Sequence, residues 1–148
     1  MAEQELLQAI TSNVRKPRNI DWAEELFGLI TQRANTPFTW GSNDCVSFAN
    51  EAVKRMTGVD FMSSFPPYTT ALEAARLVKK LGGLEAIVDL CLVPTPVLMA
   101  QRGDVVLIPM QDGGEPALAI AVGTHAWGPG DTGLIPRPIE LATKAWKV

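Results

Sequence analysis

The sequence has little of what metal sites, disulfide scaffolds and nucleic-acid surfaces require. Its 148 residues include one histidine, His125, and two cysteines, Cys45 and Cys91. Two thiols and one imidazole are too few for a four-ligand zinc site, and a small secreted scaffold would carry more cysteines. A net charge of −3 also lacks the basic excess of a nucleic-acid binder. We therefore expect no bound metal and no nucleic-acid partner.

Long apolar runs and phosphate-binding loops are missing as well. The most apolar stretch, residues 88–100, is broken by Pro94 and Pro96 and is too short to span a bilayer. The first five residues are acidic and polar, where a signal peptide would be basic and then apolar. No glycine-rich phosphate loop is present. These features predict synthesis in the cytoplasm, with no membrane partner and no cofactor.

The remaining composition is that of one ordinary globular domain. Hydrophobic residues make up 47% of the chain and charged residues 20%, which are usual fractions, and the length suffices for a proper core. We expect a single domain over residues 21–148. Residues 1–20 are expected to form a short helix or an arm that orders against a partner. The basic run at 15–18 predicts a solvated linker.

Periodicity places the helices first and the strands after them, which indicates an α+β fold. Asp21 and Thr70, each followed by glutamate three residues on, predict capping boxes. The expected helices cover about 22–33, 45–56, 71–81 and 84–92. The expected strands cover 104–110, 117–122, a short stretch within 123–127 and an edge strand over 134–140, with a tight turn at 128–133 and a short turn or helix at 141–146.

The segment from Thr39 to Phe48 carries the strongest chemical signal. Residues 42–44, Ser-Asn-Asp, are all good N-cap residues, and Cys45 follows in the first turn. Apolar residues then recur at helical spacing on the same face as Cys45: Phe48, Ala49, Ala52, Val53 and Met56. Unpaired N–H groups and the helix dipole favour a thiolate here and lower its pKa. Cys45 is therefore the candidate nucleophile.

Trp40-Gly41, Asp44-Cys45 and the helix after them resemble the nucleophile segment of the NlpC-type cysteine peptidases. These are papain-like cell-wall hydrolases with relatives in phage tails. Residues 102–107 are similar to the first core strand of that family, and residues 117–123 to the next strand. A small phage and prophage family of this fold shares the Trp-Gly-x-x-Asp-Cys start and an Ala-Trp ending, here at 145–146. The resemblance covers residues 36–125 and implies N-terminal helices packed on a small antiparallel sheet.

The histidine that the resemblance implies is absent from its expected position. Active members carry it at the start of the second strand, where Ala117 stands here, and alanine cannot accept the thiol proton. His125 lies beyond that strand, so its use would require a register shift of one strand length. The carboxylates Glu115 and Asp104 are weak substitutes for imidazole. We expect a degenerate hydrolase with Cys45 as a vestigial nucleophile, and His125 as catalytic only if the enzyme is active.

The resemblance implies a structural or assembly protein near the tail tip or baseplate of a phage or prophage, carried in the virion. Its expected partners are other tail proteins, with peptidoglycan as a second candidate. The candidate contact residues are Trp40, Asp44, Phe61, Phe65, Tyr68 and Trp127. The simpler interpretation is that the aromatic residues of loop 61–68 cover helix ends and that each tryptophan packs in the core. An active peptidoglycan endopeptidase or amidase, and a toxin- or immunity-type binding module, remain alternatives.

Two further residues are expected to have structural roles. Asp104, at the entrance of a strand, is expected to accept hydrogen bonds from backbone donors, as in the family that the chain resembles. Cys91 lies among Ile87, Val88 and Leu92, which predicts a buried thiol without chemistry of its own.

Overall fold

The helices precede nearly all of the sheet along the chain. The computed structural model describes residues 4–5, 8, 16–110 and 114–148, and the expected arm over residues 1–20 therefore lies largely outside the described residues. The helices are α2 (Trp22–Arg33), α3 (Cys45–Thr57), α4 (Ala71–Lys80) and α5 (Leu84–Cys91), with 3₁₀ turns η1 (Val97–Met99) and η2 (Ile139–Leu141). The strands are β1 (Val93–Thr95), β2 (Val105–Ile108), β3 (Ala117–Val122), β4 (His125–Gly130), β5 (Gly133–Pro138) and β6 (Lys144–Lys147).

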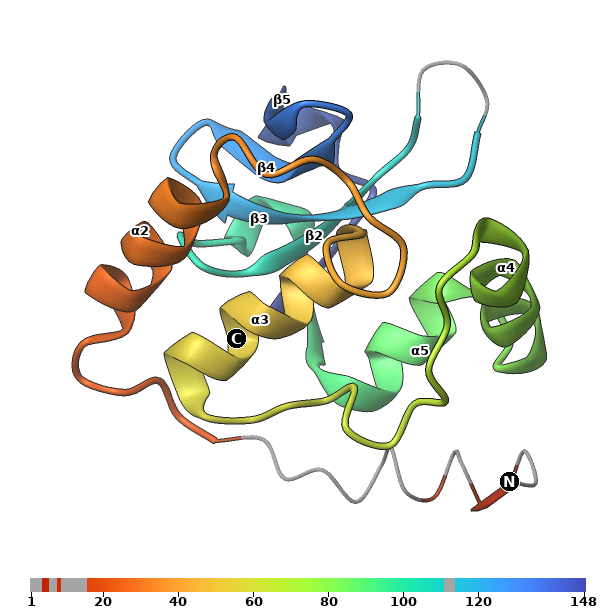
Figure 1. Cartoon of the computed structure of the whole chain (residues 1–148). Coiled ribbons are helices and arrows are strands. Elements are labelled where there is room, and N and C mark those ends of the chain that lie inside the picture. The colour runs from red at the N-terminus through yellow and green to blue at the C-terminus, as the bar shows by residue number, and fades with distance from the viewer. Residues whose placement is uncertain (1–3, 6–7, 9–15, 111–113) are drawn as a thin grey trace.

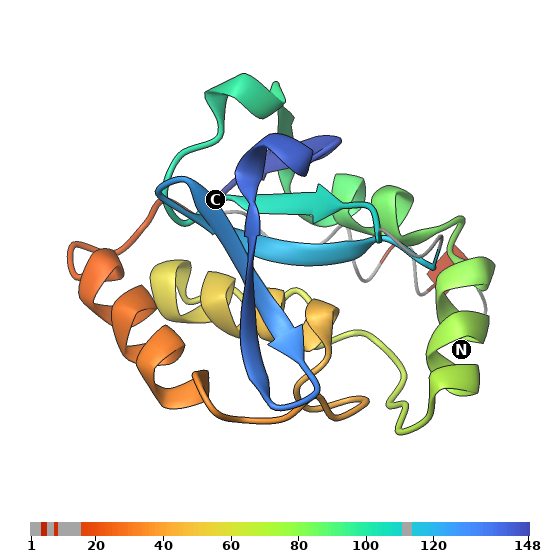
Figure 2. The ribbon, with the colours of Figure 1, turned by 90° about the horizontal axis from the view of Figure 1, so that it is seen from above.

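The six strands of the described residues form one antiparallel sheet in the order β1-β6-β2-β3-β4-β5. The α+β class predicted from the sequence is therefore confirmed. Helix α3 packs across β3 and β4 on one face of the sheet, with α2 on one side of it and the α4–α5 pair on the other (Figure 1). The opposite face of the sheet is covered by η1 and η2 (Figure 2).

Helix α3 has the start and the end that its sequence predicts. The Asp44 carboxylate accepts a hydrogen bond from the Ser47 N–H, and the Ser47 hydroxyl accepts one from the Asp44 N–H, which completes a capping box. Gly58 ends the helix in the left-handed conformation, with φ of 82°. The predicted apolar face is buried from Phe48 to Met56. Local sequence therefore determines both ends of the helix that carries Cys45.

Two local predictions are wrong. Asp21 precedes α2 but makes no capping hydrogen bond, although Glu24 and Glu25 still place negative charge in the first turn, where the dipole favours it. Residues 144–147 form strand β6 instead of a turn or helix, pairing with β1 and β2. Burial of Trp146 against the core requires this pairing, and no local pattern of the last residues reveals it.

The end of the sheet beyond β3 is a hairpin longer than expected. Strand β4 continues to Gly130 and β5 begins at Gly133, so the predicted turn at 128–133 shrinks to residues 131–132. Gly133 has φ of 147°, and a Cβ there would lie 2.1 Å from the Ala34 carbonyl oxygen. Strand β5 forms an edge of the sheet, which confirms the prediction drawn from its prolines.

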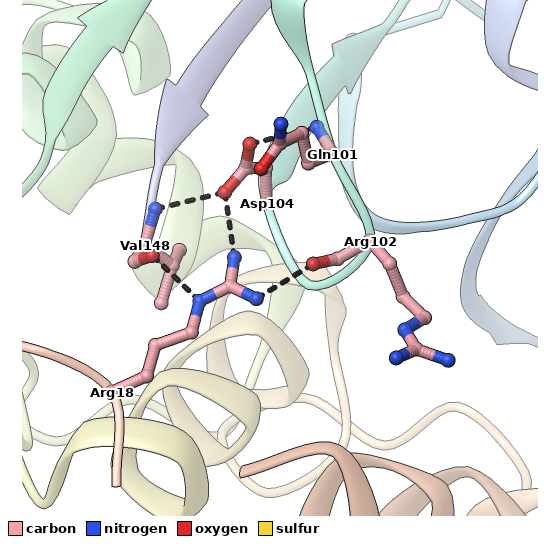
Figure 3. A network of polar contacts seen from close by, with 5 residues as sticks. All are labelled: Arg18, Gln101, Arg102, Asp104 and Val148. Carbon is pink, nitrogen blue, oxygen red and sulfur yellow. Dashed lines mark hydrogen bonds and ion pairs between the residues drawn. The ribbon is translucent and has the colours of Figure 1, made fainter. Parts of the chain in front are cut away.

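A buried polar cluster joins the start of the described domain to its last strand (Figure 3). Asp104 is fully buried, and its carboxylate accepts hydrogen bonds from the backbone N–H groups of Gln101 (2.9 Å) and Val148 (3.0 Å). Arg18 donates to this carboxylate (2.9 Å), to the Arg102 carbonyl (2.8 Å) and to the Val148 carbonyl (2.7 Å). The structural role predicted for Asp104 is confirmed.

Arg18 therefore differs from the solvated linker that the basic run predicted. Its guanidinium also lies over the Trp22 ring, 4.2 Å from the ring centroid, which adds a cation–π contact. Planar, many-donor geometry lets arginine satisfy several acceptors at once. A run of basic residues does not reveal this buried role, because every hydrogen-bond acceptor of Arg18 lies far away in the sequence.

Candidate functional site

The loop before α3 is braced by the buried side chain of Asn43. Its amide nitrogen donates to the carbonyls of Thr36 (3.3 Å) and Pro37 (3.0 Å), and its oxygen accepts from Arg33 Nη1 at 2.7 Å. All the polar atoms of this side chain are therefore used within the protein. The bracing fixes the path of the chain just before Cys45.

Asp44 organises the next layer of the site with both of its carboxylate oxygens. Oδ1 accepts from the Ser47 N–H at 2.9 Å, and Oδ2 accepts from the Gly41 N–H and the Tyr68 hydroxyl, each at 2.8 Å. Burial, followed by the charge of Asp44, raises the pKa of Tyr68 far above its ordinary value. The tyrosine is thus a permanent donor, and it fastens loop 61–68 to the start of α3.

Gly41 is required by the same arrangement. It has φ of +86°, and a Cβ at this position would lie 2.1 Å from the Tyr68 carbonyl oxygen. Only a residue without a side chain allows the two loops to approach this closely. The glycine of the Trp-Gly pair is therefore explained by packing against Tyr68.

The thiol of Cys45 has a raised pKa, contrary to the lowered value expected from its position in the first turn of α3. Burial raises this pKa from 9.0 to about 11, and the negative charge of Asp44 adds to the effect. Hydrogen bonds with the backbone of Leu118 and of the first turn act in the opposite direction but are outweighed. The expectation was wrong because the loss of hydration of the thiolate raises the pKa by more than the helix N–H groups lower it.

The β3 residue on the Cys45 side of the sheet is Leu118, one residue from the predicted position. Leu118 pairs with Leu107, and both belong to the core on the α3 face. Ala117 pairs with Ile108, which belongs to the cluster on the opposite face. Because side chains alternate along a strand, Ala117 points away from α3. Neither residue can accept the thiol proton, so Cys45 has no base at this position.

His125 lies at the other end of the strand pair. It pairs with Val122, four residues from Leu118, which corresponds to about 13 Å at ~3.3 Å per residue. The residue is exposed, and its Nδ1 lies 2.9 Å from the Thr124 hydroxyl. The structure therefore does not bring His125 to Cys45. Among the described residues, no group of three His, Cys, Asp or Glu side chains could hold a metal ion.

The predicted contact residues differ in burial, and several of them line a cleft. Phe61 and Tyr68 are buried, Tyr68 lines the cleft as well, and Trp127 is half-buried. Trp40 is 39% exposed and lines a cleft of about 720 Å³ together with Phe65. Core packing was therefore the wrong default for Trp40.

The cleft also contains polar residues that no pattern in the sequence singles out. Asn50, a buried polar residue of α3, accepts from the Phe61 N–H at 2.9 Å and donates to Asp60 at 2.9 Å. Arg33 and Glu51 line the same cleft. The only available signal was polar spacing of three and four residues within α3, which is typical of any solvated helix face.

A family model described as a domain of unknown function (DUF6950) matches residues 17–148. The chain belongs to this family. The comparison with curated proteins found no match. The matched range includes Arg18, Cys45 and Val148, so the polar cluster and the candidate site both lie within the DUF6950 domain. In the part of the chain that the structure describes, no helix is both long and apolar enough to cross a membrane.

The raised pKa predicts that Cys45 of the DUF6950 domain reacts slowly with thiol reagents. A pKa of about 11 leaves about one thiol in a thousand ionised at pH 8, against about one in ten for a pKa of 9. We expect alkylation by iodoacetamide to be about 100-fold slower than for a thiol of ordinary pKa. The rate should rise about tenfold per pH unit up to pH 11, because only the thiolate reacts.

Mass spectrometry of the peptides that contain Cys45 and Cys91 separates the two labelling rates. The control variant is His125→Ala, which should leave the rate at Cys45 unchanged. Rapid labelling at neutral pH that disappears in His125→Ala would instead demonstrate a thiolate–imidazole pair. That result would support the alternative of an active cysteine peptidase.

Proposed function

We propose that this chain is a non-catalytic domain of the NlpC type that acts as a structural or assembly protein in a phage or prophage tail. One observation carries the non-catalytic part of this proposal. Cys45 is in the nucleophile position at the start of α3, while the β3 residue on its side of the sheet is Leu118. A cysteine hydrolase needs a base there, and this chain has an aliphatic side chain instead.

The papain-like assignment is supported by the way in which the resembling segments come together. Helix α3 begins at Cys45 and packs on β3. The two segments that resemble the first core strands of the family are β2 and β3, and they are antiparallel neighbours. The Ala-Trp ending lies on β6, next to β2. A fold alone does not determine activity, and here the chemistry of the site argues against hydrolysis.

The tail role is supported by the resemblance to the small phage and prophage family and by the charge of the chain. A net charge of −3 favours protein partners over DNA. Cys45 can be retained in such a protein for packing, because it lies half-buried against the core and an unreactive thiol behaves as a small apolar group.

Genetic complementation tests this proposal in the phage or prophage that encodes the chain. Deletion of the gene is expected to abolish infectious particles and to leave incomplete tails in electron micrographs. Complementation with Cys45→Ala should restore particles to the wild-type number, since the thiol is not needed for chemistry. Circular dichroism of the purified variant confirms that it folds.

Two outcomes would each contradict one part of the proposal. Intact, infectious particles after deletion would exclude a structural tail role. Failure of a well-folded Cys45→Ala variant to restore infection, with His125→Ala failing in the same way, would support the cysteine peptidase alternative.

A further inference from the structure

Two loop segments form the walls of the cleft beside the Cys45 loop. One wall is residues 39–42, with the exposed ring of Trp40, and the other is the loop from Asp60 to Thr69. The floor is the polar side of α3, including Asn50. The nearest contact between the walls is at Gly41, whose missing Cβ leaves room for the Tyr68 carbonyl. This cleft is separate from the thiol, because Cys45 does not line it.

The walls are fixed by hydrogen bonds before any ligand binds. Asn50 Oδ1 accepts from the Phe61 N–H at 2.9 Å, and its amide nitrogen donates to Asp60 at 2.9 Å, which anchors the start of the loop. The Tyr68 hydroxyl donates to Asp44 at 2.8 Å, which anchors its end. A preformed cleft lowers the conformational entropy that the protein itself must lose on binding. The arrangement is therefore suited to recognition.

The lining indicates the class of ligand. Trp40, Met62, Phe65, Pro66 and Pro67 supply flat or flexible apolar surface along the two walls. Pro66 and Pro67 have no backbone N–H, so the middle of this wall offers no donors for pairing with an added β-strand. Aromatic-lined grooves that lack strand pairing bind extended segments in the polyproline II conformation.

The charged residues at the cleft argue against a ligand whose charges all have the same sign. Arg33 lines one part of it, while Glu51 and Asp60 line another, and Glu51 is paired with Arg55 at 3.0 Å. Because both signs are present, the cleft offers no uniform field for a polyanion such as a nucleic acid. A polypeptide segment, which carries apolar rings and scattered polar groups, matches this lining.

We propose that the cleft between residues 39–42 and 60–69 binds an extended, proline-containing segment of a partner protein, with a proline ring of that segment stacked on Trp40. This inference rests on the proposed function, since it states how a tail partner would be held. The volume of about 720 Å³ is within the range of sites that bind ligands of several residues or drug size.

Titration of the full chain with acetylated decaproline amide, which adopts polyproline II, tests the inference. In ¹⁵N NMR spectra, we expect saturable shifts of the Trp40 indole and of the Ser47, Met62 and Thr69 amides. Trp40→Ala should weaken binding at least tenfold. The matched control is Phe27→Ala, which removes an aromatic ring that is 72% exposed outside the cleft and should leave binding unchanged.

A flexible Gly-Ser decapeptide and the peptidoglycan disaccharide serve as competing probes. The inference is overturned if decaproline causes no shifts at millimolar concentration, if Phe27→Ala weakens binding as much as Trp40→Ala, or if the disaccharide alone shifts the cleft residues. Failure of this titration leaves the complementation result for Cys45→Ala untouched. Intact particles after gene deletion would exclude the tail role without altering the decaproline titration.

Discussion

Replacing Trp146 by alanine is expected to lower the free energy of unfolding by about 3–5 kcal/mol. The indole is fully buried in the core beneath the sheet, and its Nε1 donates to Asp89 at 2.8 Å. The substitution removes this contact between β6 and α5 and leaves a large cavity, which adds to the lost transfer free energy. Urea denaturation followed by circular dichroism measures the change, and the midpoint should fall without a change of slope.

Trp40→Ala is the matched control for this experiment, because the same side chain is 39% exposed at that position. We expect a cost below about 1 kcal/mol for the control. If Trp146→Ala does not fold, Trp146→Phe keeps most of the volume and should cost about 1–3 kcal/mol through the lost volume and the lost hydrogen bond, while Asp89 stays exposed and paired with Lys144. A loss below 1 kcal/mol in Trp146→Ala would show that the ring does not hold β6 in the core.

Asp104→Asn is the second substitution with a large expected effect, a loss of about 2–3 kcal/mol. The carboxylate accepts three hydrogen bonds, from Arg18, Gln101 and Val148, and an amide would direct its own N–H groups at one of these donors. The cost of leaving buried donors unpaired dominates. We expect a smaller loss of unfolding free energy than for a fully buried ion pair, because the Arg18 side chain is 18% exposed and water can partly solvate it.

A double-mutant cycle makes this prediction specific. Arg18→Met should also destabilise the domain, and the double variant should cost less than the sum of the two, since both single changes break the same contact. Asp131→Asn, at an exposed acidic residue of the β4–β5 turn, is the control and should stay within about 0.5 kcal/mol of wild type. Strict additivity of Arg18→Met and Asp104→Asn would show that the ion pair contributes nothing.

The Cys45 thiol shows where inference from local sequence stops. The N-cap, the first turn and the apolar face were all predictable, because each depends on residues within four positions of one another. The pKa was predicted in the wrong direction, because it depends on burial of Cys45 against a core whose members are distant in the sequence. Desolvation is a property of the packed core and is not encoded in the spacing around Cys45.

Strands β1 and β6 make the same distinction for the fold. Pro94 and Pro96 correctly predicted the end of α5, but they also hid β1, which pairs with the last strand over three residues. Proline is tolerated there because β1 is at the edge of the sheet. The prolines of β5, in contrast, correctly predicted an edge strand. Both strands lie at an edge of the sheet, so proline is compatible with each, and only the tertiary structure shows that residues 93–95 pair with the last strand.

The sequence by itself determined the α+β class, the boundaries of the Cys45 helix and the absence of a histidine at the start of the second core strand, because these follow from composition and from contacts between near neighbours. Tertiary structure decided which β3 residue lies on the side of Cys45, since a strand alternates its faces and register alone assigns Leu118 to the core. It also decided the role of Arg18, whose acceptor Val148 is 130 residues away, and the cleft at Trp40, whose two walls meet only after folding.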